Sequence, residues 1–149
     1  MAALATACGG DNRAAMTPDV EFRLVDRTAT SGSTIHRVRG DTITVSLRPE
    51  VLLSGSDIVA AKARTRTFWL ILSPRTQKIH EVVLTITPDA ATRLGRATAF
   101  AVGEEMAMLI DGEVASRLLI RESLSTEQLI VAGQFTRADV RALAKQLKR

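Results

Sequence analysis

The fold is decided between Met106 and Ile120, where the chain reads MAMLIDGEVASRLLI. Apolar residues dominate both halves of this stretch, and Asp111-Gly112 stands between them. Asp-Gly tolerates the positive φ angles that a two-residue hairpin turn requires. The stretch therefore predicts two antiparallel strands, residues 106–110 and 113–120, joined by a tight turn.

Upstream of this hairpin lies a strand followed by a helix. Residues 79–87 place apolar side chains on one face of a strand, and Thr87-Pro88-Asp89 then reads as a helix start. Threonine can cap a helix, proline fits the first turn, and aspartate interacts favourably with the positive helix end. The predicted helix runs to about Val102, is stopped by Gly103, and has one apolar face formed by Ala90, Leu94, Ala97 and Ala101.

The remaining patterns complete the expected fold. Alternation or branched and aromatic content predicts strands over residues 20–25, 42–47, 66–72 and 129–132. Ser56 is a candidate cap for a short helix over residues 58–62. A last helix is expected from Thr136, with Asp139 in its first turn and an apolar stripe of Val140, Leu143, Ala144 and Leu147. Together these elements predict an α+β domain, with an antiparallel or mixed β-sheet and two main α-helices packed on one face.

Composition fits one globular domain. The chain has 149 residues, of which 46% are hydrophobic and 24% charged. Its longest apolar runs in the body, such as the five residues 68–72, are far shorter than the roughly 18 residues that cross a bilayer. The formal net charge is +4, but acidic residues are interspersed with the basic ones and aromatic residues make up only 3%. Nucleic acid is therefore not an expected partner.

The N-terminal residues suggest a membrane anchor. Cys8, the only cysteine, follows Leu4-Ala5-Thr6-Ala7 and precedes Gly9-Gly10. This arrangement resembles the end of a bacterial lipoprotein signal peptide, in which small residues fit the peptidase and the thiol takes the lipid. The resemblance implies a residual signal in residues 1–8, a flexible tether in residues 9–19 and a folded domain in residues 20–149. The alternative is an incidental thiol.

Few residues suggest catalytic activity. His36 and His80 are far apart, and neither has the spacing of a metal ligand. His80 and Glu81 are adjacent in a predicted strand, so their side chains point to opposite faces. Ser54-Gly55-Ser56 lacks the strand-turn-helix context of a nucleophilic serine.

Other polar residues fit structural roles. Asp57 suits a helix start, Asp111 suits the hairpin turn, and Glu104-Glu105 suits a solvated loop. We therefore expect no enzyme activity, no catalytic residues, no metal site and no cofactor. The aromatic residues are expected in the core, with a polypeptide groove as the alternative for Trp69; they are Phe22, Phe68, Trp69, Phe100 and Phe135.

Several segments occur in an order that resembles one family. They read EFRLV at residues 21–25, VLLSGSDIVAA at 51–61, LTITPDAA at 84–91, AMLIDGEVAS at 107–116, IRE at 120–122, and GQFT at 133–136 with Ala138. In this order they resemble the first extracytoplasmic head domain of the SecD/SecDF translocation accessory proteins. Ser123 stands where the family has proline, and residues 123–127 lack its usual glycines, so the conformation of this loop is not carried over.

The resemblance implies a non-enzymatic, protein-binding module on the extracytoplasmic face of the bacterial cell membrane. It reaches the head domain only and does not extend to the family's transmembrane motor. The expected protein is a stand-alone lipoprotein of the cell envelope, anchored through Cys8, whose partners are Sec translocon components or secreted polypeptides and include no nucleic acid or small-molecule substrate. An exposed sheet edge is the expected means of holding an extended chain. The alternatives are a structural envelope lipoprotein with no role in translocation, and a small hydrolase.

Overall fold

The computed structural model describes residues 19–69, 71, 75–133, 135, 137, 138, 141, 144 and 145. Within these residues the chain forms nine strands, one α-helix and the 3-10 turn Gly55–Asp57. The elements are β1 (Val20–Leu24), β2 (Thr34–Arg37), β3 (Thr44–Leu47), β4 (Leu53–Ser54), β5 (Ile58–Trp69), β6 (Thr76–Ile86), α1 (Pro88–Ala99), β7 (Glu105–Ile110), β8 (Glu113–Leu119) and β9 (Gln128–Ala132). They build three antiparallel sheets, ordered β4-β1-β7-β8, β2-β3 and β5-β6-β9.

The predicted hairpin lies at the centre of the fold. β7 and β8 pair across Asp111 and Gly112, whose φ angles are 51° and 83°, so the predicted turn is confirmed. β7 is apolar without alternation because both of its faces are covered. Met106, Met108 and Ile110 belong to the main core, whereas the intervening side chains enter a second, smaller core.

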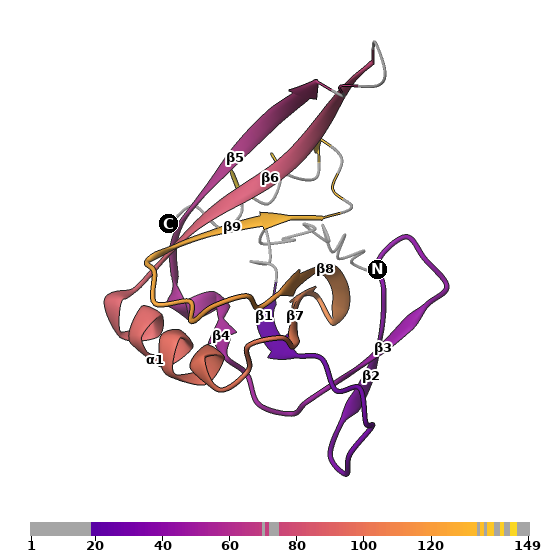
Figure 1. Ribbon diagram of the computed structural model, residues 1–149, viewed down its shortest axis with the longest axis vertical. Helices are drawn as coiled ribbons and strands as arrows, with labels where there is room; N and C mark the ends of the chain where they lie inside the picture. The colour runs from indigo at the N-terminus through magenta and orange to yellow at the C-terminus, as the bar shows by residue number, and fades with distance from the viewer. Residues whose placement is uncertain are drawn as a thin grey trace, which may run out of the picture.

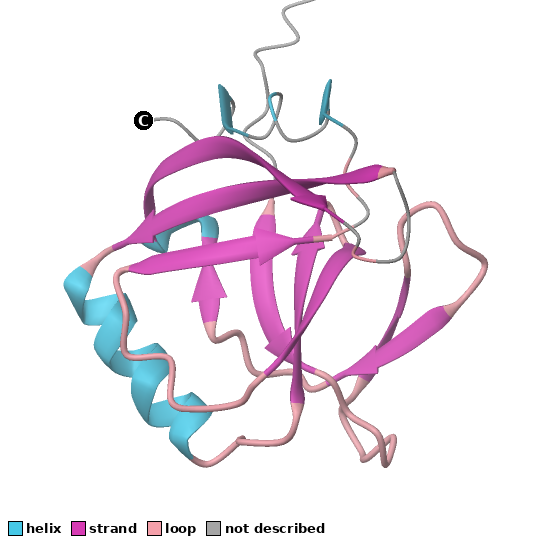
Figure 2. Ribbon diagram, turned by 45° about the horizontal axis from the view of Figure 1, so that its top comes forward, coloured by secondary structure: helices cyan, strands magenta, loops and turns pink. Residues whose placement is uncertain are grey.

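The two cores lie on opposite faces of the central four-stranded sheet. The main core joins that sheet to α1 and to the inner face of β5-β6-β9, where Leu84 is fully buried. The smaller core packs Ala107 and Leu109 against Val45 and Leu47 of β3. Figure 1 shows the ribbon β5-β6 extending above this body and the ribbon β2-β3 lying at its lower right. Figure 2 shows how much of the fold is strand.

Helix α1 begins as predicted and ends early. The Thr87 hydroxyl accepts a hydrogen bond from the Ala90 N–H at 3.2 Å, and Pro88 occupies the first turn. The helix ends at Ala99 and not near Val102, because Phe100 is its C-cap. Its buried face matches the predicted one at Ala90 and Leu94.

The predicted α+β class with two main helices on one face is wrong. Three antiparallel sheets dominate the described residues, and α1 is the one α-helix whose bounds they give. The other helical positions among them are Arg137, Ala138, Arg141, Ala144 and Lys145. The short helix expected over residues 58–62 is instead the start of β5, because these residues pair with β6. The preceding turn is closed by Asp57, which accepts the Ser54 N–H at 3.0 Å, so Ser54 takes the place expected for Ser56.

The second main helix of that prediction falls mostly outside the described residues. Thr136, Asp139, Val140, Leu143 and Leu147 all lie there. The strand expected over residues 66–72 is the outer end of β5, which stops at Trp69. β2 was missed, since its residues carry little apolar content and pair with β3 alone among the described strands.

Candidate functional site

A two-stranded arm projects beyond the third sheet (Figure 1). β9 pairs with β6 only at residues 81–85. Beyond that point residues 65–69 of β5 and 76–80 of β6 pair with each other alone among the described strands, and we call these two segments the arm. No third described strand supports them. Arg137 and Arg141 lie near Thr65 and His80 at the inner end, whereas Phe68 and Trp69 at the outer end are exposed.

β5 is also the longest sheet edge in the described part of the chain. It has 12 residues, lies at the end of the order β5-β6-β9 and pairs there with β6 only. In an antiparallel sheet, alternate residues of an edge strand direct their N–H and C=O groups away from the neighbouring strand. In contrast, the edge strand β8 is partly covered, since the Arg39 N–H donates to Val114 O and the Ser116 hydroxyl to Ala132 O.

A charged cluster holds the inner end of the arm. The side chain of Glu81 is only 7% exposed and lies 2.7 Å from Nη2 of Arg64 and 3.8 Å from Nη1 of Arg66. Nε of Arg64 also donates to the same carboxylate at 2.8 Å. The guanidinium of Arg66 lies 5.0 Å from the centre of the Phe68 ring, within cation–π range. We call Arg64, Arg66 and Glu81 the base cluster; it compensates the charge of a buried carboxylate and fixes two arginines on one face.

Sequence reasoning missed this cluster, although a signal for it exists. Lys62, Arg64, Arg66 and Phe68 alternate along one face of a strand, and Glu81 pairs directly across from Arg64. To predict that pairing, one must know the register between two strands that are separated by a turn. The residue pattern of a single strand does not give that register.

The outer end of the arm is apolar and exposed. The exposed fractions are 37% for Phe68, 78% for Trp69 and 100% for Ile71. The core placement predicted for these two aromatic residues, and for Phe100, is therefore wrong, whereas Phe22 and Phe135 are buried as expected. β5 extends past the part of the sheet that β9 covers, so the side chains of its last residues have no core to pack against.

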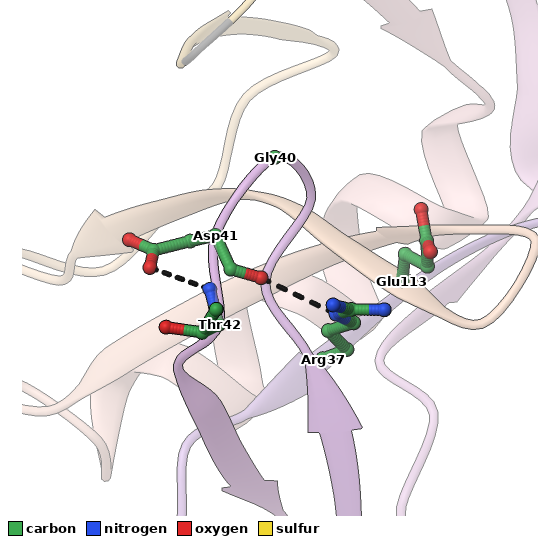
Figure 3. A pocket seen from close by; sticks show the side chains of 5 residues that line it. All are labelled: Arg37, Gly40, Asp41, Thr42 and Glu113. Carbon is green, nitrogen blue, oxygen red and sulfur yellow. Dashed lines mark hydrogen bonds between the residues drawn. The ribbon is translucent and has the colours of Figure 1, made fainter.

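One surface pocket, of about 350 Å³, lies at the turn after β2 (Figure 3). Its lining consists of Arg37, Gly40, Asp41, Thr42 and Glu113. The Asp41 carboxylate accepts the Thr42 N–H at 2.6 Å, and Nε of Arg37 donates to Asp41 O at 3.3 Å. These bonds hold the turn itself, so the pocket gives no sign of a ligand.

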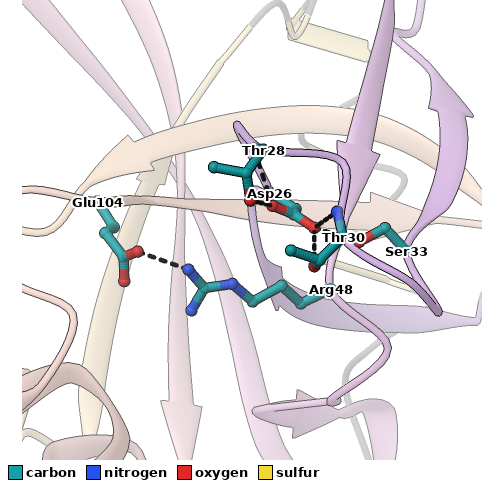
Figure 4. A network of polar contacts seen from close by, with 6 residues as sticks. All are labelled: Asp26, Thr28, Thr30, Ser33, Arg48 and Glu104. Carbon is teal, nitrogen blue, oxygen red and sulfur yellow. Dashed lines mark hydrogen bonds and ion pairs between the residues drawn. The ribbon is translucent and has the colours of Figure 1, made fainter.

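A carboxylate network orders the loop between β1 and β2 (Figure 4). Asp26 is 4% exposed and accepts hydrogen bonds from the hydroxyls of Ser33, Thr30 and Thr28 and from two backbone N–H groups. The Ser33 and Thr30 hydroxyls hold the pKa of Asp26 well below its usual range, although burial opposes this effect. All donors come from one loop, so the network has a structural role.

The two histidines occupy separate structural positions. His36 Nδ1 lies 2.9 Å from Gly112 O at the hairpin turn. His80 lies on the arm, 3.3 Å from the Thr65 hydroxyl, beside a pocket of about 140 Å³ that Arg137 and Arg141 also line. No carboxylate lines that pocket within the described residues.

The candidate carboxylates are paired with arginines. Glu104 lies 2.6 Å from Arg48, and Glu105 lies 3.6 Å from Arg27. Asp57 lies 2.7 Å from Arg93, in addition to closing its turn. The described residues contain no group of three potential metal ligands. Cys8, the predicted lipid anchor, lies outside them, together with the tether.

Comparison with known proteins identifies the family. The family model described as the SecDF P1 head subdomain matches residues 33–149. The chain belongs to the SecDF P1 head family. The predicted resemblance is therefore confirmed, and the segment that precedes the match contains β1, a strand of the central sheet.

Two solved SecDF structures share this fold. One is a structure of the membrane component SecDF that enhances protein export, with a TM-score of 0.63, 20% identity and coverage of 89% of this chain and 62% of that one. The other is SecDF in its super-membrane-facing form, with a TM-score of 0.63 and 20% identity over 89% of this chain and 19% of that one. No curated protein sequence matches. The chain thus spans 62% and 19% of these two relatives, and no helix in its described part is long and apolar enough to cross a membrane.

Proposed function

We propose that this SecDF P1 head domain is a non-enzymatic protein-binding module that assists protein export outside the cytoplasmic membrane. Membership of the family supports a role connected with export, since SecDF is a membrane component that enhances it. The observation that carries the binding role is the edge of β5, with 12 residues paired on one side only within the described chain.

The proposed mode of binding is the addition of a strand to β5. An extended polypeptide would satisfy the outward backbone groups of β5, and main-chain hydrogen bonds require little of its side-chain sequence. Such tolerance suits a protein that meets many different secreted chains. Lys62, Thr65 and Thr67 are exposed on β5 inward of the bulky Phe68 and Trp69, so this inner part of the strand offers polar or cationic side chains to an incoming strand.

The location proposed for this module is the extracytoplasmic face of the membrane, where lipid on Cys8 would anchor it. The small residues before Cys8 and the glycines after it support this part of the proposal. A Cys8→Ala variant is expected to leave the membrane fraction when the membranes are washed at high salt, which removes proteins held by headgroup contacts alone. Retention of that variant after the wash would remove the anchor from the proposal, with the β5 site unaffected.

Photo-cross-linking tests the β5 site directly. A photoreactive amino acid replaces Thr67, which is exposed on β5, and a matched variant carries it at Thr92, which is exposed on α1. Each variant is placed on membranes that hold a secreted polypeptide arrested in transit. We expect adducts from position 67 and none from position 92.

Adducts of equal yield from both positions, or from neither, would contradict strand addition at β5. If the cells also export normally without this protein, the alternative of a structural envelope protein with no role in translocation replaces the proposal.

A further inference from the structure

The end of the arm carries several exposed apolar side chains. Phe68, Trp69 and Ile71 expose apolar side chains within four consecutive positions, and we call these three residues the tip. Single exposed apolar residues are normal on proteins, but a cluster at a projecting end indicates a contact surface. Figure 1 shows this end as the most distant part of the β5-β6 ribbon from the body.

Positive charge is concentrated on the same ribbon. Residues 58–86 carry five cationic residues and one acidic residue, a net charge of +4 that equals the formal net charge of the whole chain. The one acid, Glu81, is buried in the base cluster at the inner end. Between residues 65 and 80 there is no acidic residue. Arg66 lies 3.8 Å from Glu81 but keeps 51% of its side chain exposed, and Lys78 lies on the neighbouring strand.

The shape of the arm decides which partner fits. Binding sites for small molecules are concave, and none of the four pockets described in the structure is lined by Phe68, Trp69 or Ile71. A lipid bilayer needs no preformed pocket, because its interface deforms around an exposed apolar side chain. Tryptophan is enriched at the membrane interface, and cationic residues just behind it attract anionic headgroups.

We propose that the tip inserts into the interface of an anionic phospholipid bilayer, with Arg66 and Lys78 against the headgroups. Arg66 fits this position, because its guanidinium lies over the Phe68 ring at 5.0 Å and its side chain remains 51% exposed. An acidic polypeptide would satisfy the cations but leave the apolar tip in water. The proposal concerns side chains at the end of β5, so it does not depend on strand addition along the edge.

Trp69 provides the readout, since it is the only tryptophan of the chain. The full chain is mixed with vesicles of phosphatidylcholine containing about one-third phosphatidylglycerol, and with vesicles of phosphatidylcholine alone. We expect a shift of the Trp69 emission to shorter wavelength and quenching by brominated acyl chains with the anionic vesicles. Added salt weakens this binding, because it screens the attraction of Arg66 and Lys78 to the headgroups.

Matched variants separate tip binding from general adhesion. Ile71→Ser is expected to weaken partitioning into the anionic vesicles by about tenfold through lost apolar burial. Arg66→Gln and Lys78→Gln each weaken it by about fivefold through one lost charge. The controls are Phe100→Ser, which removes a 94% exposed apolar side chain outside the arm, and Arg121→Gln, which removes an exposed charge there; neither is expected to change partitioning.

Three results would overturn the proposal. One is an unchanged Trp69 emission with anionic vesicles. Another is an equal loss of partitioning in Phe100→Ser and Ile71→Ser. The third is an emission shift with polyglutamate and none with the vesicles, which would assign the tip to acidic polypeptides instead. Far-ultraviolet circular dichroism checks that each variant keeps the fold.

Discussion

Replacing Gly95 by alanine tests how the loop after β8 packs on helix α1. A Cβ atom at Gly95 would lie 2.0 Å from Oγ, 3.0 Å from Cβ and 3.2 Å from Cα of Ser125. The hydroxyl can rotate away, but the other two atoms move only with the loop. That loop is tied to the helix, since the Ser123 hydroxyl donates to Gly95 O at 2.8 Å and the Leu124 N–H donates to the Thr98 hydroxyl at 2.8 Å.

The expected magnitude comes from two opposing effects. In an open helix, glycine to alanine would stabilise by about 1 kcal/mol through helix propensity. Overpacking against a fixed neighbour costs about 1–3 kcal/mol. We therefore expect Gly95→Ala to lower the free energy of unfolding by about 1 kcal/mol, because the overpacking term exceeds the gain in propensity. In the Ser125→Gly background the Cβ and Oγ clashes are absent, and Gly95→Ala should be neutral or stabilising.

The measurement is a double-mutant cycle of urea unfolding, followed by far-ultraviolet circular dichroism. Tryptophan fluorescence is a poor probe of this transition, since Trp69 is already 78% exposed in the folded protein. The expected coupling between Gly95→Ala and Ser125→Gly is about 1 kcal/mol in favour of the double variant. Additive effects, or stabilisation by Gly95→Ala alone, would refute the close approach of Ser125 to α1.

Three further substitutions test other parts of the fold. Asp26→Asn should make stability less dependent on pH in acid. The folded-state pKa of Asp26 lies well below its ordinary value of 3.8, so its contribution is complete above that pH and is lost progressively as the pH falls below it. Urea midpoints between pH 7 and about pH 2 will show the difference. Leu84→Ala should cost about 2–5 kcal/mol because the residue is fully buried, whereas Ile130→Ala, on the opposite face of the same sheet and 46% exposed, should cost far less in the same urea titration. Gly112→Val should weaken the β7-β8 hairpin, because a β-branched residue strains at φ 83°, and thermal melting should detect the loss.

Local signals in the sequence predicted the elements that local interactions fix. The Asp111-Gly112 turn and the Thr87 cap each depend on neighbouring residues, and both form as expected. The start of β5 did not follow local signals. Ala60 and Ala61 favour a helix, but pairing with Thr85 and Leu84 of β6 overrides that preference.

The candidate site was harder to predict than the core, because it depends on where one strand stops. The run from Phe68 to Leu72 has the composition of a buried strand. Burial would need a third strand beyond His80, and β9 reaches only Glu81 on β6. The sequences of β5 and β6 do not indicate how long β9 is. The exposure of Trp69 therefore could not be predicted from residues 68–72 alone.

The short reach of β9 also explains why one ribbon can offer two kinds of contact. An isolated two-stranded ribbon has marginal stability in water, so the arm needs support from its inner end. The base cluster gives this support on one face, and the pairing of β5 with β6 from Ile58 to Trp69 connects it to the main core. Backbone groups along β5 and side chains at the tip then remain available independently. Changes such as Ile71→Ser should therefore affect contacts at the tip while the backbone edge is unchanged.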